Sequence, residues 1–377
     1  MTNPTRAPRF LALDVFRGMT ICFMIIVNTP GSWRYIYTPL EHAEWHGFTP
    51  TDLVFPSFLF AVGNALSFVM NKWVDMPEKA VLWKIFKRTF LIFLIGYLLY
   101  WFPFVTTDEG GHMMLAPFKD TRVFGVLQRI ALCYGIAALM VYYLKPRTIL
   151  WITLGILVLY YPVLFFGGDQ PDPLGLKTNA VLKLDRWLVG ESHMYHGEGI
   201  AFDPEGFLST FPAVVNVIGG YYAGRYIQVK GKTYETLTGL LIAGSVLAAL
   251  AYMWDFSFPV NKKIWSSSFA VYTVALDLVM IAVIIYIIDF QKKTRWTYFF
   301  EVFGKNPLVI YIFSGLIAQF LGMLPGGESG SAYGWIYTNI FKPVDPYFGS
   351  FLFALMIMFT CWLLGWWMDK QKWYVKI

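Results

Sequence analysis

The chain has 377 residues, of which 57% are hydrophobic, 19% aromatic and only 14% charged. A soluble protein carries about 25% charged residues, so the 30 basic and 24 acidic side chains present here are too few for such a surface. The composition excludes an ordinary soluble enzyme and a disordered or collagen-like chain. It indicates a polytopic membrane protein.

The net charge of +6 is interpreted as a topology signal, because membrane proteins concentrate Lys and Arg in their cytoplasmic loops. The sequence has no zinc-finger spacing, RNP pattern or basic helix, so no nucleic-acid partner is expected. Its three cysteines, Cys22, Cys133 and Cys361, lie in separate apolar runs without a CxxC pair. They are predicted to pack in the core, and neither a metal site nor a disulfide is indicated.

Ten apolar runs approach the length of about 20 residues that a membrane-spanning helix needs. The predicted fold is an all-α helical bundle with about ten transmembrane helices, in a single transmembrane domain over residues 1–377. The N-terminal segment MTNPTRAPRF is read as no cleavable signal, because charged residues interrupt the apolar run that follows it. The ten runs are 10–29, 52–71, 84–104, 122–144, 147–166, 207–228, 234–254, 266–289, 302–323 and 347–368.

The distribution of basic residues predicts that both termini are cytoplasmic. With the N-terminus inside, the inner segments hold about twice as many Lys and Arg residues as the outer ones. Of the outer segments, 167–206 is the longest, and a long polar loop on a helical bundle is commonly functional. The segments predicted to face outward are 30–51, 105–121, 167–206, 255–265 and 324–346.

The first run contains charged and polar residues that are costly in a membrane. Asp14 and Arg17 are three residues apart and can pair on one helix face, either as a structural ion pair or at a functional site. Asn28 lies near the outer end of this run, where Pro30 and Gly31 are expected to end the helix.

The segment EHAEWHGFTPTDLVFP places two histidines, His42 and His46, four residues apart before the second run. The order H-A-E-W-H matches HExxH only loosely, so a neutral imidazole acting as base or nucleophile is favoured over a metal site. Thr49 and Pro50 are a good helix start. Asp52 therefore either caps that helix or orients a catalytic histidine.

Three further segments carry polar groups at predicted outer boundaries. In RVFGVLQRI, Arg122 and Arg129 share a helix face that Gln128 adjoins, and they suit either a polyanionic ligand or a salt bridge. In FDPEGFLST, Asp203 and Glu205 either cap a helix or hold a cationic or hydroxyl-rich substrate. The segment NKKIWSSSF contains a possible phosphate ligand and an interfacial tryptophan, among the residues Asn261, Lys262, Trp265, Ser266 and Ser268.

Together these segments resemble the heparan-alpha-glucosaminide N-acetyltransferase family, which includes lysosomal enzymes and bacterial NagX-type homologues. The resemblance rests on LDVFRGMTICFMIIVNTPG, PLEHAEWHGFTPTDLVFPSFLFAVG, RVFGVLQRI, FDPEGFLST, NKKIWSSSF and GKNPLVIY, in that order. It implies an acyltransferase that moves acetyl from cytosolic acetyl-CoA to the amine of a glucosamine-type sugar on the lumenal or periplasmic side. The family's active-site histidine falls on His42 and its asparagine on Asn28. His46 departs from the lysosomal pattern, which has Asn there.

On this reading His42 is the general base, Asp52 or Glu41 fixes its tautomer, and Asn28 stabilises the oxyanion or holds the thioester. A direct attack by the amine is favoured over an acetyl-histidine intermediate. The residues predicted to bind the sugar are Glu41, His46, Asp203, Glu205 and Asn261. Those predicted to bind CoA are Arg122, Gln128, Arg129, Lys262, Trp265, Ser266 and Arg17; entry of CoA from the cytoplasm would bring Lys84, Lys87, Arg88 and Lys305 to its nucleotide end. No metal is expected.

Two other functions stay open from the sequence. One is an amino-sugar or chitin-fragment transporter, since ten spans and an outward polar pocket suit a carrier equally well. The other is an O-acetyltransferase that acts on an envelope glycan. The expected partners are the lipid bilayer, coenzyme A and an amino sugar, and the resemblance is compatible with a homodimer. The short segment before LDVFRG favours a bacterial inner membrane over a lysosomal one.

Overall fold

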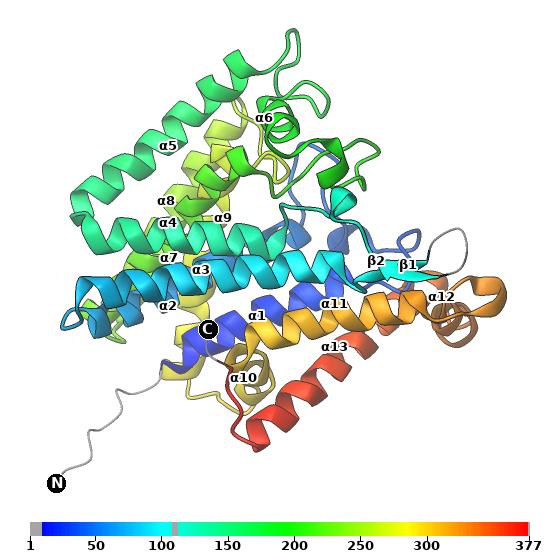
Figure 1. Ribbon diagram of the computed structural model, residues 1–377. Helices are drawn as coiled ribbons and strands as arrows, with labels where there is room; N and C mark the ends of the chain where they lie inside the picture. Colours follow the sequence, from blue (N-terminus) through cyan, green and yellow to red (C-terminus); the bar gives the residue numbers. More distant parts are fainter. Residues whose placement is uncertain (1–9, 108–111, 376–377) are drawn as a thin grey trace. The chain divides into compact units, whose positions relative to one another are not determined.

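The computed structural model describes residues 10–107 and 112–375, whose regular structure is mostly helical (Figure 1). The only two strands of the described residues, β1 (Val105–Thr107) and β2 (Met113–Leu115), pair in antiparallel register with Val105 opposite Leu115. The helices are α1 (Leu11–Asn28), α2 (Pro50–Trp73), α3 (Glu78–Trp101), α4 (Val126–Tyr143), α5 (Pro146–Gly167), α6 (Ala180–Val189), α7 (Phe207–Lys230), α8 (Tyr234–Asp255), α9 (Ser267–Ile285), α10 (Thr297–Lys305), α11 (Pro307–Met323), α12 (Ala332–Ile336) and α13 (Pro346–Lys370).

Every one of the ten predicted spans falls on helix, which confirms an all-α polytopic fold. Within the described residues, seven helices are long and apolar enough to cross a membrane: α1, α2, α4, α5, α8, α13 and α9 with its π-helical extension to Phe290. The run 302–323 becomes two helices, α10 and α11, with an 85° bend between them, and counting this pair as one span gives eight.

The difference from about ten spans lies in α3 and α7. Both are 24 residues long, which is enough to span a membrane, but neither combines this length with the hydropathy and low charge of the candidate spans. The first three turns of α3 carry five charged residues, and α7 includes polar Asn216 and Arg225. The placement of both termini in the cytoplasm stays a prediction. Some of the basic residues counted for that prediction lie outside the described residues: Arg6, Arg9 and Lys376. Residues 108–111 of the segment 105–121, which is predicted to face outward, also lie outside them.

The chain divides into two compact units. Unit 1 comprises residues 1–41, 226–244 and 277–376, and unit 2 comprises essentially 42–225 and 245–276. The borders fall inside α7, α8 and α9, so these helices contribute to both units. That the whole chain acts as one transmembrane acyltransferase domain stays a prediction.

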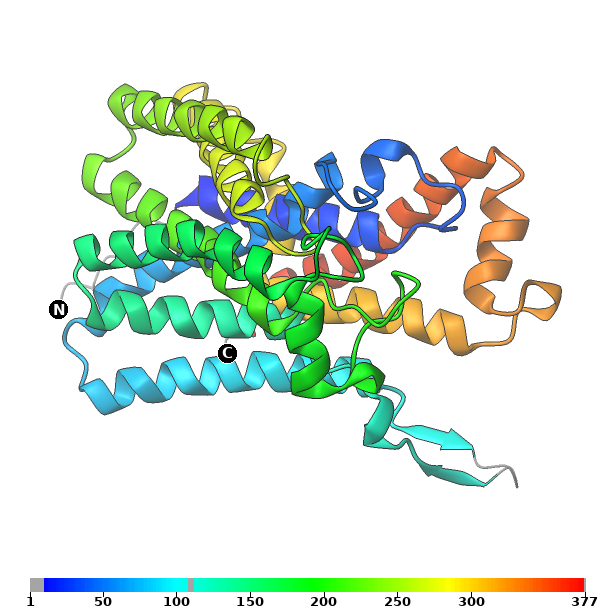
Figure 2. The ribbon, with the colours of Figure 1, turned by 90° about the horizontal axis from the view of Figure 1, so that it is seen from above.

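In unit 2 the helices α2 and α7 pack closely because glycines of each helix lie against the backbone of the other. Figures 1 and 2 show α3 and α4 side by side, with the β1–β2 hairpin extending beyond the end of α3. Between α2 and α7, a side chain on Gly63 would lie 1.8 Å from the carbonyl oxygen of Val217. A Cβ on Gly220 would likewise lie 1.9 Å from the Phe60 carbonyl oxygen, so only glycine permits this approach of the two helices.

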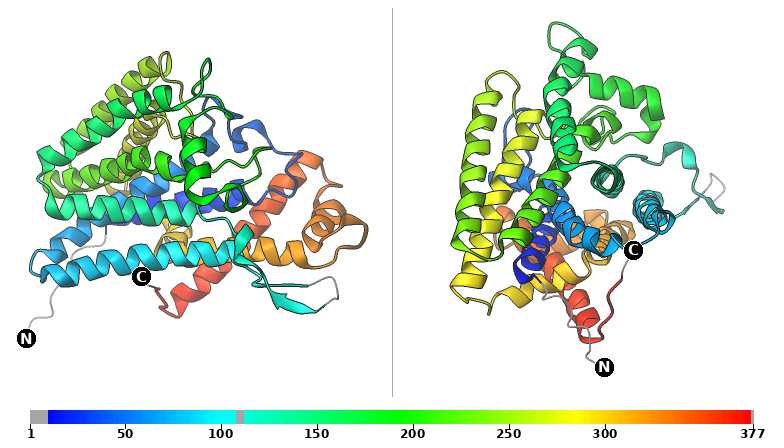
Figure 3. Two further views of the ribbon diagram at one scale, coloured as in Figure 1. Left: turned by 45° about the horizontal axis from the view of Figure 1, so that its top comes forward. Right: turned by 90° about the vertical axis from the view of Figure 1, so that its left-hand side faces the viewer.

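The segment 167–206, which the sequence predicts to face outward, is a folded layer with its own apolar core. The helix α6 lies beside α5 (Figure 3). It buries Val181 and Leu182 in a cluster to which Phe202 and Phe258 contribute from neighbouring loops. Asn179 caps α6 by accepting a hydrogen bond from the amide of Leu182. This packing fixes the loops 190–206 and 256–266, which supply most of the polar groups described below.

Candidate active site

Asp52 serves as helix cap and as histidine partner at the same time. It is the third residue of α2, and its Oδ2 accepts hydrogen bonds from the backbone amides of Thr49, at 3.0 Å, and Ala43, at 3.2 Å. Its Oδ1 lies 2.7 Å from Nδ1 of His42. A carboxylate can only accept, so Nδ1 carries the proton and Nε2 presents its lone pair. The predicted helix cap is thus confirmed, and the same carboxylate contacts His42; that it orients a catalytic histidine stays a prediction.

The imidazole of His42 is accessible, with 39% of its side chain exposed, whereas the Asp52 carboxylate is 1% exposed. Burial and the positive charge of Lys262 lower the pKa of His42 below its ordinary value of 6.5, and they outweigh the opposing effects of Asp52 and Glu205. His42 is therefore a neutral imidazole at pH 7 whose Nε2 carries a lone pair, the state that a general base requires.

Lys262, from loop 256–266, reaches the same imidazole. Its Nζ lies 3.0 Å from Nε2 and 3.1 Å from Nδ1 of His42. Burial lowers the pKa of Lys262, with Lys263 adding to this effect, although Asp52 and Glu205 oppose it. The sequence predicted that Lys262 binds a CoA phosphate, and its contact with His42 was not foreseen.

The predicted sugar ligands His46 and Asn261 also meet. The Nδ2 of Asn261 lies 3.3 Å from Nδ1 of His46, and the amide of Gly47 donates to the carbonyl of Val260 at 2.8 Å. Asn261 is fully buried, and its Oδ1 accepts from the amide of Ile264. The loop that carries His42 and His46 is thus hydrogen-bonded to the loop that carries Lys262 and Lys263.

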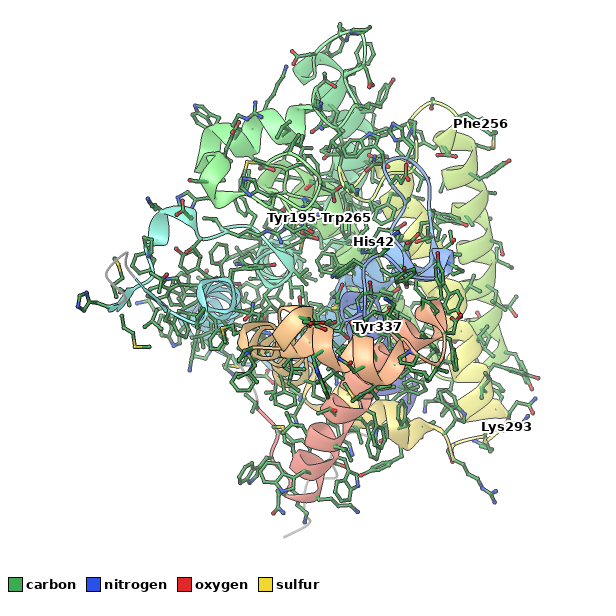
Figure 4. The ribbon with its side chains drawn as sticks, turned by 90° about the vertical axis from the view of Figure 1, so that its right-hand side faces the viewer. His42, Tyr195, Phe256, Trp265, Lys293 and Tyr337 are labelled. Carbon is green, nitrogen blue, oxygen red and sulfur yellow. The ribbon has the colours of Figure 1, made fainter. Side chains whose placement is uncertain are left out.

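Arg122 binds both predicted acidic residues. Its Nε donates to Oδ1 of Asp203 at 2.7 Å, and its Nη2 lies 2.8 Å from Oε2 of Glu205. Its guanidinium also stacks 4.7 Å above the ring of Tyr195, which Figure 4 labels with His42 and Trp265. Glu205 is buried, but the positive charge of Arg122 still lowers its pKa. Because two carboxylates neutralise Arg122, this group suits an amine or hydroxyl better than a phosphate.

Arg129, in the first turn of α4, lies fully buried. Its Nη2 donates to the carbonyl of Gly206 at 2.9 Å and also to the hydroxyl of Ser209, and its guanidinium carbon lies 4.9 Å above the ring of Trp265. Trp265 is held by a hydrogen bond to Oδ1 of Asn216. These contacts replace the salt bridge that was one of the two alternatives for Arg129.

Two more predicted CoA ligands lie in the interior. Gln128 is fully buried, and neither atom of its amide has a hydrogen-bond partner among the described residues. The hydroxyl of Ser266 accepts from the amide of Asn261 at 3.0 Å, so it shapes the loop that carries the lysines. Binding of CoA by any of these residues stays a prediction.

Three predicted site residues belong to unit 1. Asn28 is the last residue of α1 and is exposed, and Glu41 is exposed after a short 3-10 helix. Arg17 pairs with Asp14 at 2.9 Å, which confirms that these residues share a helix face, and it also donates to the carbonyl of Gly304. The proposed roles of Asn28, Glu41 and Arg17 at the site stay predictions.

Sequence reasoning assigned no role to two polar groups of unit 2, the partly buried Lys263–Glu198 pair and the buried Asp185. Lys263 forms an ion pair with Glu198 and donates to the carbonyl of Glu44 at 2.7 Å. Asp185 accepts from the amide of Phe207 at 2.8 Å at the start of α7, and burial raises its pKa to about 7. Its spacing from Val181 and Leu182 places Asp185 on the buried face of α6, so periodicity could have revealed it. The Lys263–Glu198 pair left no such signal. Across residues 10–107 and 112–375, no group of three His, Cys, Asp or Glu side chains could hold a metal ion.

The fold and composition define an integral membrane protein of the helical class, with a His–Asp–Lys cluster beside an arginine–carboxylate group. The chain belongs to the heparan-alpha-glucosaminide N-acetyltransferase family. The family profile described as "Heparan-alpha-glucosaminide N-acetyltransferase, catalytic" matches residues 9–253, which confirms the resemblance seen in the sequence.

Two curated relatives carry the same name. The chain is 27% identical over 361 residues to heparan-alpha-glucosaminide N-acetyltransferase of Homo sapiens, an alignment that covers 81% of this chain and 52% of the human protein. With the Mus musculus protein it is 27% identical over 368 residues, covering 82% and 54% of the two chains. The chain therefore spans about half the length of the curated relatives it matches.

Proposed function

We propose that this protein transfers an acetyl group from cytosolic acetyl-CoA to the amine of a glucosamine-type sugar on the periplasmic side of a bacterial inner membrane. The observation that carries the proposal is the His42–Asp52 pair, with Nδ1 and Oδ1 2.7 Å apart and Nε2 unblocked by Asp52. Membership of the N-acetyltransferase family supports the choice of acyl transfer over transport. Asn28 is the proposed amide donor to the oxyanion.

The proposed reaction needs a base because only an unprotonated amine attacks a thioester carbonyl. Nε2 of His42 takes the amine proton as the new nitrogen–carbon bond forms. The Asp52 carboxylate stabilises the resulting imidazolium, and it needs no reorientation because Thr49 and Ala43 already hold its second oxygen. The carbon–sulfur bond then breaks, and the imidazolium returns its proton to the departing CoA thiolate.

Recognition of the sugar is assigned to the groups around the dyad. Glu205 and Asp203 supply negative charge for an amine or acceptors for hydroxyls, while Arg122 keeps both side chains fixed. His46 and Asn261 form the opposite edge and offer ring and amide nitrogens. Such bidentate and fixed polar groups orient a hydroxyl-rich ligand at low entropic cost.

Binding of the donor is assigned to the cationic groups near the dyad. Acetyl-CoA supplies the activated acetyl group, and its phosphates require positive charge. Lys262 beside His42 and Arg129 beneath the site provide that charge within unit 2. Arg17 is the corresponding candidate in unit 1. No step of the proposed reaction uses a metal.

The test is a transfer assay with detergent-purified protein, acetyl-radiolabelled CoA and glucosamine. We expect labelled N-acetylglucosamine from the wild type and a rate lower by about 10²–10⁴-fold for His42→Ala, the range of general-base contributions. His112→Ala, which removes an exposed histidine elsewhere, is the matched control and should keep its activity. Label that hydroxylamine releases from the sugar would indicate an ester and an O-acetyltransferase. Uptake of unmodified sugar into vesicles, with no label transferred, would identify a carrier instead.

A further inference from the structure

The amine of Lys262 occupies the position that an acceptor amine needs. A nucleophilic amine must place an N–H within hydrogen-bond distance of Nε2 of His42 in order to be deprotonated there. Nζ of Lys262 lies 3.0 Å from that atom. The side chain is partly exposed, so an acyl donor that reaches His42 also reaches this amine. Lys262 thus reproduces, within the chain, the arrangement proposed for the sugar.

The neighbouring Lys263 provides an internal comparison. Its Nζ is engaged by the Glu198 carboxylate and by the carbonyl of Glu44, and its side chain is 13% exposed. Its amine is therefore engaged by two oxygen acceptors and not by the imidazole of His42. Lys262, in contrast, contacts that imidazole, and burial lowers its pKa. Two consecutive lysines therefore differ in whether the amine contacts the proposed base.

We propose that Lys262 is a site of self-acetylation, at which the protein modifies its own chain when acetyl-CoA is bound and no sugar acceptor is present. This inference rests on the proposed function. The Lys262 ammonium first gives one proton to solvent, which leaves a lone pair on Nζ. A second proton then passes from Nζ to Nε2 of His42 as the Nζ–carbon bond forms at the acetyl carbonyl. The carbon–sulfur bond breaks, and the CoA thiolate leaves with the proton from the imidazolium. The products are Nε-acetyl-Lys262 and free CoA.

The modification would stop sugar transfer. It removes a positive charge from beside His42 and leaves an amide, which has no basic nitrogen, next to Nε2. A bound sugar amine competes with Lys262 for the same base, so acceptor protects the enzyme. Activity is then lost progressively during incubation with acetyl-CoA alone and is preserved when acceptor is supplied from the start.

The experiment is mass spectrometry of the purified full chain after incubation with acetyl-CoA, with and without saturating glucosamine. A chymotryptic peptide that ends at Trp265 carries both lysines, and fragmentation separates them. We expect acetyl on Lys262 at least roughly 100-fold faster than on Lys263, the lower end of general-base catalysis. Glucosamine should suppress it, and His42→Ala should slow it by a similar factor. Lys262→Arg should remove the modification, while Lys263→Arg, the matched control, should leave it.

Several outcomes would overturn the inference. Equal acetylation of Lys262 and Lys263, or an unchanged rate in His42→Ala, would show ordinary chemical acetylation. An acetyl group on His42 in place of Lys262 would indicate a covalent intermediate. If the sugar is acetylated while Lys262 stays unmodified, the self-acetylation is refuted and the proposed function stands. If neither the sugar nor the chain is acetylated, the proposed function fails as well.

Discussion

Replacing Asp52 with Asn separates its two roles. The Asn side chain keeps an oxygen that can accept from the amide of Thr49, so the start of α2 should persist. At His42, however, an amide nitrogen facing Nδ1 donates a hydrogen bond and favours the tautomer with its proton on Nε2, which is the wrong one for a base. The contact being replaced is 2.7 Å long and buried on the aspartate side.

The size of the effect follows from that contact. A hydrogen bond to a charged group contributes about 1.5–3 kcal/mol. At 1.36 kcal/mol for each factor of ten, its loss alone costs about 10–150-fold in rate, before the inverted tautomer is counted. We therefore expect Asp52→Asn to lower kcat by about 10²–10⁴-fold, with the midpoint of thermal unfolding little changed.

The assay is label transfer to glucosamine, measured with thermal unfolding on the same preparation. Thr49→Ala is the comparison variant, because it removes a hydroxyl that donates to Oδ2 of Asp52 while leaving the contact of Oδ1 with His42 and the backbone amide of residue 49. It should lose about 1 kcal/mol of stability and keep its activity. An Asp52→Asn protein that folds normally and retains more than about a tenth of the wild-type rate would refute the assigned role of the carboxylate.

Three other perturbations test the site and the packing beneath it. Because the pKa of His42 is lowered, transfer should persist below pH 6.5 and fall only as the imidazole becomes protonated. Lys262→Gln removes a positive charge that lowers this pKa. In that variant the acidic limb of the pH–rate profile should therefore move to higher pH. Arg122→Gln leaves Asp203 and its neighbouring glutamate buried without their cation and should cost about 3–5 kcal/mol, measured as a drop in the thermal midpoint. Gly63→Ala forces a Cβ to within 1.8 Å of a backbone oxygen and should cost at least about 1–3 kcal/mol by the same measurement.

Each of these has a comparison variant. Arg186→Gln breaks an ion pair whose two side chains are at least half exposed, so its loss should change the thermal midpoint little. Gly155→Ala adds a methyl group where nothing lies within 4 Å and should be neutral. An acidic limb that stays in place in Lys262→Gln would remove the argument that this lysine tunes His42.

The sequence predicted those features that arise from local patterns. Apolar runs located the helices, and the order Thr-Pro-Thr-Asp identified the start of α2, now seen as a capping box. The sequence offered Asp52 or Glu41 as the partner of His42, and the structure shows the contact with Asp52. Local patterns also favoured about ten spans. The length of an apolar run does not reveal that charges reduce the hydropathy of α3 or that the chain bends after Lys305.

Long-range contacts could not be predicted in this way. Arg122 meets Glu205 across 83 residues of sequence, and Lys262 meets His42 across 220. Nothing in the local pattern distinguishes Lys262 from Lys263, since the direction of each side chain is set by the turn that Asn261 and Ser266 hold together. The contact between Lys262 and His42 could therefore not be predicted, and the assignment of Lys262 to a CoA phosphate stays a prediction.

The capping box at the start of α2 also sets the depth of the imidazole. His42 lies in a loop, yet its Nδ1 is tied to the first turn of a helix whose apolar length suits a membrane span. The position of Nε2 of His42 is thereby tied to the helix α2 and not to the loop alone. Any sliding or tilting of α2 along the membrane normal carries Nε2 with it. Bilayer thickness, through its effect on the position of this helix, becomes a physical variable that can tune the alignment of base and substrate.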